Sequence, residues 1–364
     1  MKSYLFPGQG SQHLGMGEQL FDRFPNIIEA ANDILGYSIK TLCLEDPQRQ
    51  LRLTQYTQVA LYVVNALTYR QHLQQGGGLP DFVAGHSLGE YNALESAGVF
   101  SFEDGLRLVQ KRGDLMSQAP RGAMAAILGI SADSVAGILA EQGLTRIDIA
   151  NYNAPTQTII SGLEADIRDA QAVFESCQAM YVPLNTSGAF HSRYMQSARD
   201  EFAQFLEAFE FRDPQIPVVA NVTAKPYVGT EVVRTLADQL TGSVRWLDSM
   251  RFLLDQGVTE FRELGPGDVL SKLVESIRSS AMSKPVSEFA AENSQQLVDE
   301  WNRTCPIGSR VRVKGYDDIL VTKSRAVLLF GHRAAIYMEN YQGYFALSEV
   351  EPLIEQQPLV EKVW

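Results

Sequence analysis

The order of apolar and polar positions in the first 122 residues predicts strands that alternate with helices. A strand is predicted over Ser3–Phe6, and a second apolar run, Phe82–Ala84, leads into a glycine. Helical periodicity covers residues 17–35, 55–74 and 101–118, and the middle segment is so rich in aliphatic and tyrosine residues that we expect it to be buried. Alternating strands and helices imply an α/β fold, in which a parallel sheet has helices on both faces.

The pattern changes between residues 123 and 187. Successive apolar runs predict a strand at 123–129, a helix at 132–142, a strand pair at 146–153 and 157–162, a helix at 163–176 and a strand at 179–184. This β-α-β-β-α-β order is typical of a ferredoxin-like subdomain. Because the signals of the larger fold resume at Val218 and continue to about residue 280, we interpret 123–187 as an insertion into a core formed by 1–122 and 188–280.

The remaining residues predict a separate C-terminal unit. Residues 281–303 are polar and helical in pattern, with little apolar periodicity, and we interpret them as a linker. Between residues 304 and 364, short runs of strand-forming residues lie at 309–314, 319–324, 326–330, 335–339 and 343–348. Because Gly, Asp or Asn separates these runs, they predict a small β-rich domain of the SH3-like barrel type.

Composition and charge narrow the function classes. The 364 residues, 45% of them hydrophobic, suffice for one large core and a smaller domain. The net charge of −12 disfavours nucleic acid as a partner, because phosphates would be repelled. No apolar run is long enough to span a bilayer, and Pro7 interrupts the N-terminal run too early for a signal peptide. We therefore expect a cytoplasmic protein without membrane association, and the acidic surface, with no obvious apolar stripe, favours a monomer.

Cysteine usage agrees with that compartment. Cys43, Cys177 and Cys305 are scattered, odd in number and without metal-type spacing. We interpret them as reduced, buried, structural residues, and we expect no metal site.

Candidate chemistry begins at Gly85-His86-Ser87-Leu88-Gly89, between the second predicted strand and the start of a helix. A strand, a Gly-x-Ser-x-Gly turn and a helix form a nucleophile elbow, as in α/β-hydrolase-like folds. Both flanking positions need glycine, since a side chain there would collide with neighbouring backbone. The turn would raise Ser87 Oγ above the sheet edge and aim the first amides of the helix at the group that it attacks. The alternative is a glycine-rich loop with an N-capping serine.

A serine nucleophile needs a base, and His191 is the plausible distant one. It follows the predicted insertion, where the chain must return to the main sheet. The other distant histidines, His13, His72 and His332, lie in contexts typical of surface or packing positions. An isolated histidine is more often structural than catalytic, so spacing alone leaves both interpretations of His191 open.

Six motifs together carry a resemblance to a known family. They are, in chain order, Phe6–Gln12, Gly85–Tyr91, Lys111–Met116, Gly188–Ser192, Val244–Trp246 and Glu263–Gly267. Over about residues 1–280 the chain resembles the malonyl-CoA:acyl carrier protein transacylases, a group that includes the acyltransferase domains of polyketide synthases. The resemblance implies that Ser87 attacks the thioester of malonyl-CoA while His191 takes its proton. The phosphopantetheine thiol of an acyl carrier protein then accepts the malonyl group, with no permanently bound cofactor.

The resemblance also assigns roles around the Ser87–His191 pair. The oxyanion hole would consist of the backbone amides of Gln9 and Leu88, although the residues alone indicate no more than an ordinary glycine turn around Gln9. A backbone carbonyl, here that of Arg245, would orient His191. The resemblance therefore implies a Ser-His dyad without a catalytic aspartate.

Four side chains are implied to bind the substrate. Arg112 would grip the malonyl carboxylate through two parallel hydrogen bonds, although its place in a predicted helix is also typical of a solvated helix-end cation. Phe190 would occupy the space of an α-methyl group, or would simply pack in the core. His86 and Asn153 would help to line the site.

The residues after about 280 are additional to the simple fatty-acid transacylases of this family. Discrete acyltransferases that serve polyketide synthases often carry the Gly-Ala-Phe-His form, so we expect a role in polyketide biosynthesis, with synthase modules as further partners. The C-terminal stretch is locally basic through Arg310, Arg312, Lys314, Lys323, Arg325 and Arg333. These residues would help to dock an acidic carrier protein or module, or the domain only caps the core.

Two alternative functions use the same residues. A hydrolase of this fold would let water attack the acyl-serine and so clear stalled acyl groups from carrier proteins. The resemblance implies that such hydrolases lack the arginine found at Arg112. A catalytically idle docking module would retain Ser87 as a relic, and the presence of Ser87, His191 and Arg112 together favours malonyl transfer over both.

Overall fold

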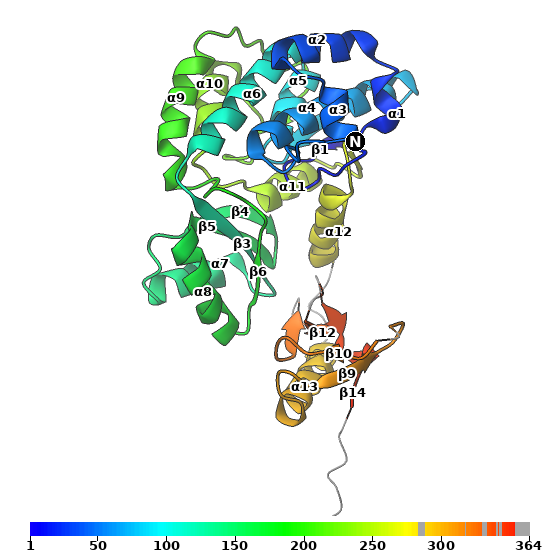
Figure 1. Cartoon of the computed structure of the whole chain (residues 1–364), viewed down its shortest axis with the longest axis vertical. Helices are drawn as coiled ribbons and strands as arrows, with labels where there is room; N and C mark the ends of the chain where they lie inside the picture. Colours follow the sequence, from blue (N-terminus) through cyan, green and yellow to red (C-terminus); the bar gives the residue numbers. More distant parts are fainter. Residues whose placement is uncertain (283–287, 317, 330–332, 340, 342–343, 354–364) are drawn as a thin grey trace, which may run out of the picture.

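The structure is a computed structural model that describes residues 1–282, 288–316, 318–329, 333–339, 341 and 344–353. A four-stranded parallel sheet lies inside the larger, upper lobe of the molecule (Figure 1). Its strands, in the order β7-β2-β1-β8, are Val218–Val219, Phe82–Gly85, Lys2–Phe6 and Glu260–Glu263. All three strand pairs are parallel. The predicted α/β class with a parallel sheet is confirmed, and the two N-terminal strands lie where the apolar runs predict them.

Different helices cover the two faces of this sheet, because successive side chains of a strand point to opposite sides. Tyr4 and Phe6 pack into the main core, and Leu5 packs into a second one. The helices of the main core include α2 (Pro25–Leu35), α4 (Thr54–Gln74), α5 (Gly89–Ser96), α6 (Phe102–Gln118), α9 (Gln196–Leu206) and α10 (Val232–Asp238). Those of the second core are α11 (Trp246–Asp255) and α12 (Val269–Met282). As predicted, α4 is buried along most of its length.

The helix predicted over residues 17–35 is divided into two. α1 covers Glu18–Phe21, and α2 begins at Pro25. Proline is tolerated in the first turn of a helix and breaks one that is already under way, so it starts α2 rather than continuing α1. A further short helix, α3 (Ile39–Leu44), was not predicted, and Ser38 caps it by accepting a 3.1 Å hydrogen bond from the amide of Thr41.

A second, antiparallel sheet forms the smaller lobe on the left of Figure 1. Its elements are β3 (Gly122–Leu128), α7 (Ala132–Glu141), β4 (Asp148–Ala154), β5 (Gln157–Leu163), α8 (Glu164–Ser176) and β6 (Met180–Pro183). The strand order is β4-β5-β3-β6. β4 also contacts the main lobe, because the amide of Tyr152 donates to the carbonyl of Val244 (2.9 Å) and the amide of Val244 donates to the carbonyl of Ala150 (2.8 Å). This contact brings the end of the inserted sheet beside the segment before α11.

The C-terminal module is formed by a helix and two three-stranded antiparallel sheets. Its elements are α13 (Glu288–Thr304), β9 (Arg310–Val313), β10 (Leu320–Val321), β11 (Val327–Leu329), β12 (Arg333–Ile336), β13 (Phe345–Ala346) and β14 (Val350–Pro352). The linker interpretation of residues 281–303 is wrong for α13, since Val298 and Trp301 are buried in the core of the module. The sequence reading also missed β14, which pairs with β9. Three short 3-10 turns complete the fold: Arg193–Met195, Gly229–Glu231 and Leu347–Glu349.

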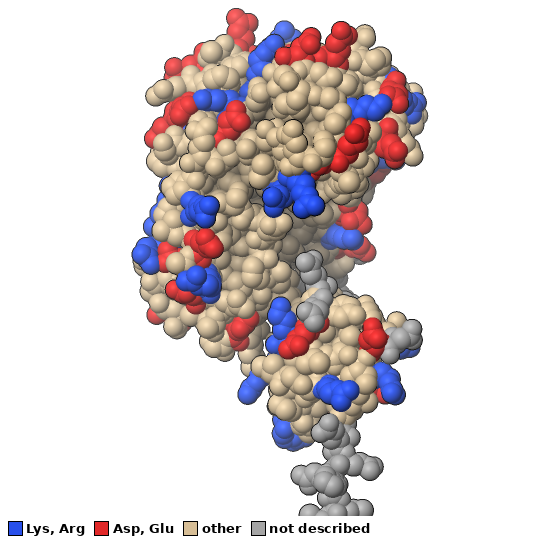
Figure 2. All heavy atoms as spheres, viewed as in Figure 1, with Lys and Arg blue, Asp and Glu red and all other residues tan. Residues whose placement is uncertain are grey.

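The module packs against the smaller lobe. Met180 of the edge strand β6 and Ala335 of β12 share a small apolar cluster, against which Leu128, Val327 and Tyr337 also pack. Figure 2 shows the module touching the body of the molecule at this level. Apolar side chains of the module therefore cover part of the sheet edge that β6 forms.

The remaining sequence predictions have mixed outcomes. Cys43 and Cys305 are buried, but Cys177 is exposed because it follows the last turn of α8 at the surface, so its predicted burial is wrong. His72 is buried and its Nε2 lies 2.9 Å from the hydroxyl of Tyr4, a packing role, whereas His332 falls outside the described residues. Among the residues that the structure describes, no helix has the length and apolar character needed to cross a membrane.

Candidate active site

The sharp turn between β2 and α5 carries Ser87. Its backbone has a φ angle of 52°, in the left-handed region that non-glycine residues rarely adopt. A Cβ atom on Gly85 would overlap with the backbone of Gly89, and one on Gly89 would overlap with the carbonyl of Phe6. Both flanking positions therefore require glycine, as a nucleophile elbow predicts.

Asn221, at the end of the strand next to β2, holds this turn in place. It follows β7, its Nδ2 donates to the carbonyl of Gly85 (2.7 Å), and its Oδ1 accepts from the amide of Ser87 (2.7 Å). Asn221 is buried, so both bonds lie away from competing water. Sequence reasoning placed this residue only within a strand signal and gave it no role.

Ser87 and His191 meet although 104 residues separate them. Ser87 Oγ lies 2.7 Å from His191 Nε2, while His191 Nδ1 lies 2.8 Å from the carbonyl oxygen of Gln239 and 3.2 Å from that of Gly242. Carbonyl oxygens only accept, so Nδ1 carries the hydrogen and Nε2 is free to accept the proton of Ser87. The pair thus has the tautomer that a general base requires.

The carbonyl that orients His191 is not that of Arg245, so this prediction is wrong. Arg245 caps the N-terminus of α11, and its carbonyl accepts from both the amide and the hydroxyl of Ser249. Gln239 lies instead at the C-terminal end of α10, where carbonyl groups have no partner within the helix. Backbone carbonyl groups do accept from His191 Nδ1, but they belong to Gln239 and Gly242.

Burial controls the electrostatics of His191. Two main causes together lower the pKa of its imidazole to about 3. The larger is desolvation by burial, and the second is the nearby positive charge of Arg112. Its side chain is only 4% exposed. The ring is therefore neutral at physiological pH, as a base must be before it takes a proton.

Arg112 points into the site from α6, so the interpretation as a solvated helix-end cation is wrong. The guanidinium is 1% exposed, and it donates to Gln58 Oε1 (2.6 Å), to Gln239 Oε1 (3.0 Å) and to Ser87 Oγ (3.2 Å). Its carbon atom lies 5.5 Å from the centre of the Tyr91 ring, a cation–π distance. Burial lowers the pKa of Arg112 from its usual value. No local signal in the sequence marks Gln58, which is one of several polar residues in the predicted helix 55–74, or Gln239.

The other predicted site residues lie around this centre. His86 Nε2 lies 2.9 Å from Asn153 Oδ1, and the His86 ring packs beside Trp246. Phe190 is buried in the main core beside the base. Within the described part of the chain, no hydrogen-bond acceptor is found for the amides of Gln9 and Leu88.

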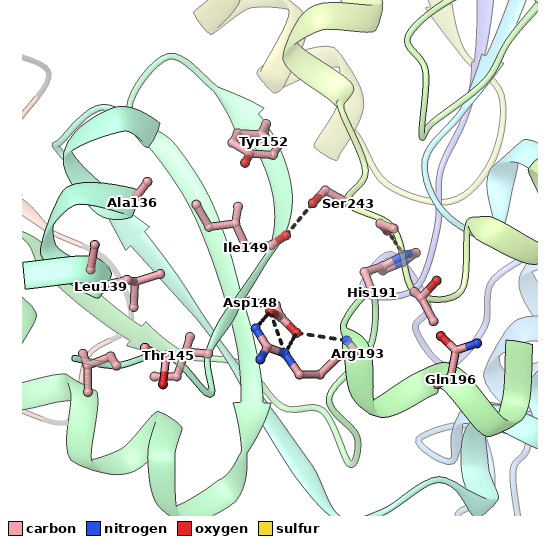
Figure 3. Close-up of a pocket in the computed structure, with 15 residues that line it drawn as sticks. Ala136, Leu139, Thr145, Asp148, Ile149, Tyr152, His191, Arg193, Gln196 and Ser243 are labelled. Atoms are coloured by element: carbon pink, nitrogen blue, oxygen red, sulfur yellow. Dashed lines mark hydrogen bonds and ion pairs between the residues drawn. The ribbon is translucent and has the colours of Figure 1, made fainter. Parts of the chain in front are cut away.

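A pocket of about 810 Å³ lies between the smaller lobe and the main lobe (Figure 3). Leu139 and Ile149 line one side, and His191 and Gln196 lie at the other. Ser87 is not among the residues that line this pocket, whereas Gly242, whose carbonyl lies 3.2 Å from His191 Nδ1, is one of them. Arg193 and Asp148 pair across it, with Nε 2.9 Å from Oδ2, and so tie the segment that follows the base to β4.

Among the described residues, no group of three or more His, Cys, Asp or Glu side chains is arranged to hold a metal ion.

Comparisons with known proteins give matches over the part of the chain that carries the candidate site. The acyl transferase domain family matches residues 3–299. The polyketide biosynthesis malonyl CoA-acyl carrier protein transacylase BaeC of Bacillus velezensis is 53% identical over 287 residues, which are 78% of this chain and 99% of that protein.

Solved structures of similar fold also match most of the chain. The crystal structure of a malonyl CoA-acyl carrier protein transacylase from Burkholderia pseudomallei matches with a TM-score of 0.76 and 50% identity, over 78% of this chain and 99% of that one. A second match, with a TM-score of 0.73 and 36% identity over 76% and 93% of the two chains, is the complex PlMCAT:AntF, a type II PKS acyl-carrier protein with its malonyl-transacylase. The family match ends before β9, so the two small sheets of the C-terminal module lie outside it.

Proposed function

The chain belongs to the acyl transferase domain family, and from this premise we propose that it moves a malonyl group from malonyl-CoA to the phosphopantetheine thiol of an acyl carrier protein. The observation that carries the proposal is the buried guanidinium of Arg112, 3.2 Å from the oxygen of the nucleophile. The names of the matching relatives support the same activity and, for BaeC, a role in polyketide biosynthesis. They give no support to the hydrolase alternative.

The first half-reaction forms a malonyl ester on Ser87. As Oγ attacks the thioester carbonyl carbon, its proton passes to His191 Nε2, 2.7 Å away. The carbon–sulfur bond then breaks, and the same nitrogen returns the proton to the departing thiolate of coenzyme A. Because Gln239 and Gly242 accept from Nδ1, they stabilise the imidazolium that forms between these two steps.

The amides of Gln9 and Leu88 are the proposed oxyanion hole. Gly8 lies so close to the elbow that a Cβ atom there would overlap with the carbonyl of His86, which brings the following amide towards Ser87. Leu88 precedes the first turn of α5, so its amide is among those that a helix leaves unpaired. One such donor contributes about 3–4 kcal/mol to transition-state stabilisation.

Arg112 is the proposed selector of malonyl groups. A single methylene separates the two carbonyl carbons of a malonyl group, so a guanidinium beside Ser87 Oγ is within reach of the free carboxylate of the ester on that oxygen. Binding of this carboxylate also offsets the positive charge that lowers the pKa of His191. An acyl group without a carboxylate would leave the buried cation uncompensated, which disfavours it.

Three further side chains are proposed to shape the substrate site. Phe190, buried next to the base, would limit the space at the α-carbon of the acyl group. His86 and Asn153 contact each other and are proposed to line the entry, where the amide of Asn153 offers a polar contact to the substrate.

The second half-reaction requires a carrier protein. Its phosphopantetheine thiol gives its proton to His191 and attacks the malonyl-serine ester, which frees Ser87 and forms a new thioester, a ping-pong sequence. A complex of a related malonyl-transacylase with a type II PKS acyl-carrier protein supports this partner. Polyketide synthase modules are proposed as the wider partners.

The C-terminal module is a proposed docking surface for that acidic partner. Arg310, Arg312 and Lys314 are exposed along β9 and alternate with the buried Val311 and Val313. None of the three forms an ion pair with another described residue, although Glu351 lies opposite Arg312 in the strand register. A basic strand of this kind would speed encounter with an acidic carrier protein.

The organisation of the chain also remains a proposal at its finer level. We propose that 1–122 and 188–280 form an α/β-hydrolase-like core, that 123–187 form a ferredoxin-like subdomain, and that 304–364 form a small barrel of the SH3 type, against which α13 packs. We further propose that the protein is a cytoplasmic monomer without a permanently bound cofactor.

Intact-protein mass spectrometry tests the proposed function directly. The protein is mixed with malonyl-CoA and then with a holo carrier protein. We expect a malonyl adduct on the enzyme that is absent in Ser87→Ala and that moves to the carrier protein. Release of free acid from a pre-loaded carrier, without a lasting adduct on the enzyme, would instead support the hydrolase.

A further inference from the structure

Glu90 is a buried carboxyl group that has no part in the reaction as described above. It lies three residues after the nucleophile, in the first turn of α5, and its side chain is completely buried. Ionisable side chains are rarely buried in this way unless they are fully hydrogen-bonded, because removal of a charge from water is costly. The burial of Glu90 beside the nucleophile therefore requires a physical explanation.

In the hydrogen bonds that Glu90 forms, its carboxyl oxygens are always the acceptors. Oε1 accepts from the hydroxyl of Tyr227 (2.7 Å) and from the amide of Asn221 (3.0 Å), and Oε2 accepts from Nε2 of Gln239. Burial raises the pKa of Glu90 to about 7, while these bonds and the charge of Arg112 act in the opposite direction and favour the carboxylate. The surroundings of Glu90 are thus built for a group that only accepts.

Gln239 links this carboxyl to the reacting groups. Its Nε2 donates to Glu90 and to the carbonyl of Ser87 (2.9 Å), and its Oε1 accepts from Arg112 (3.0 Å). Its main-chain carbonyl accepts from His191 Nδ1 (2.8 Å). One residue therefore contacts the nucleophile, the base and the arginine.

A side-chain amide can be turned by 180° with almost no change in shape, and only its neighbours decide which end is oxygen. Beside an acceptor such as Glu90, the nitrogen must face the carboxylate. The oxygen of Gln239 must then face Arg112, where it meets a donor. Glu90 and the carbonyl of Ser87 are the two acceptors that hold the nitrogen on this side, and Glu90 is the one that carries a charge.

We propose that Glu90 is a positioning residue: its carboxyl group sets the orientation of the Gln239 amide, which in turn holds the Arg112 guanidinium where it meets the carboxylate of the acyl group. The proposal rests on the malonyl transfer proposed above and adds the group that keeps its selector in place. Glu90 does not touch the substrate and acts only through Gln239 and Arg112.

Glu90→Gln is the sharpest test. This change keeps the size of the side chain but puts an NH₂ group where donors now meet an oxygen, so that Gln239 turns or at least one hydrogen bond to residue 90 is lost. Loss of one hydrogen bond to a charged group corresponds to a change of about tenfold or more. We expect the ratio of kcat/KM for malonyl-CoA to that for acetyl-CoA to fall by about this factor, mainly through a higher KM for malonyl-CoA.

Glu95→Gln is the matched control. Glu95 lies in the same helix and pairs with Arg70 at 2.5 Å, away from Ser87 and Arg112. Both variants replace a buried carboxyl group and are expected to lower the melting temperature. Only Glu90→Gln should change the malonyl-to-acetyl ratio, measured as acylation of Ser87 by intact mass. An equal change in the two variants, or none in Glu90→Gln, would overturn the proposal.

Two further variants identify the route of the effect. In an Arg112→Ala background, Glu90→Gln should cause little additional loss of selectivity, because both act through the same guanidinium. Gln239→Leu breaks the link but leaves the main-chain carbonyl for His191, and it should reproduce the loss of selectivity even where Glu90→Gln does not fold. A Gln239→Leu variant with normal selectivity would also overturn the proposal.

The two proposals fail in different ways. If wild-type protein forms no malonyl-serine ester, malonyl transfer itself is wrong. If the ester forms normally and selectivity survives in Glu90→Gln and Gln239→Leu, only the role of Glu90 is wrong.

Discussion

The catalytic core and the C-terminal module differ in what they bury. Around the elbow, polar or charged side chains such as Glu90, Arg112, Asn221 and Gln239 are at most 1% exposed. In the described part of the module, the buried side chains are apolar apart from Thr322. Burial of polar groups costs free energy unless each is hydrogen-bonded, so a region that retains many of them is shaped by something other than stability. The described interior of the module is a packed apolar one, whereas the interior of the core is arranged around the candidate site.

Two arginines within the core sharpen the contrast. Arg70, whose side chain is 26% exposed, is paired directly with the carboxylate of Glu95. Arg112 donates instead to the neutral oxygens of Gln58, Gln239 and Ser87. A buried guanidinium surrounded by neutral acceptors is well placed to bind an anionic substrate, whereas one that has a resident carboxylate partner is structural.

The largest expected effect is that of removing the base. His191→Ala should slow acylation of Ser87 by about 10²–10⁴-fold, because the hydroxyl loses its proton acceptor. The measurement is the rate of adduct formation by quenched-flow mass spectrometry. His72→Ala, which removes a buried histidine that contacts the hydroxyl of Tyr4, is the control and should retain the rate.

The second largest effect is expected when Arg112, the proposed selector of malonyl groups, is replaced. Arg112→Ala should lower kcat/KM for malonyl-CoA by about 100-fold and change that for acetyl-CoA far less, since only malonyl carries the carboxylate. Arg107→Ala on the exposed side of the same helix is the matched control. Equal losses for the two acyl donors would mean that Arg112 supports the fold and not the choice of substrate.

The protonation state of His191 tests the burial of the core. Desolvation favours the neutral ring, so a pKa lowered to about 3 leaves it neutral from pH 8 down to pH 5. The unfolded chain binds a proton near pH 6.5 that the native state does not, so this residue lowers the free energy of unfolding as pH falls from about 6.5 towards 3. NMR of the imidazole, assigned with His191→Ala, should show no titration in the native protein between pH 8 and pH 5. A midpoint near 6.5 would show a solvated ring.

The smallest effect on the chemistry is expected from the module. A chain that ends at Met282 should acylate Ser87 at a rate within about twofold of the full chain, because no described residue of the module is hydrogen-bonded to Ser87, His191 or Arg112. It should lose some stability, about 1–3 kcal/mol, since Met180 becomes exposed. A large loss of acylation would contradict the division of labour between the two regions.

The proposed binding of the carrier protein to the C-terminal module can be tested separately from the acylation step. In the full chain, Arg310→Glu with Lys314→Glu should raise KM for the carrier severalfold at low salt and leave acylation by malonyl-CoA unchanged. An unchanged KM for the carrier would mean that the module only covers the edge strand β6.

Local patterns were sufficient where the chemistry depends on neighbours in the chain. The elbow needs a strand, two glycines and a helix within a few residues, and all of these are visible around Ser87. The parallel sheet and the inserted sheet follow from apolar runs with strand periodicity. The boundaries at Pro25 and in α13 were missed because a proline and a few buried side chains, Val298 and Trp301 among them, decide them.

The sequence by itself predicted that Ser87, His191 and Arg112 belong to one site, because the motif order and the family resemblance point to these residues, and the structure brings the three side chains together. Only the tertiary structure decided which carbonyls hold His191, since Gln239 and Gly242 become available through the end of α10 and not through any motif. Only the fold, likewise, joins Glu90, Gln239 and Arg112 into one network, because their bonds span 127 and 149 positions of the chain. Contacts over such separations depend on how the helices pack, and no local pattern records them.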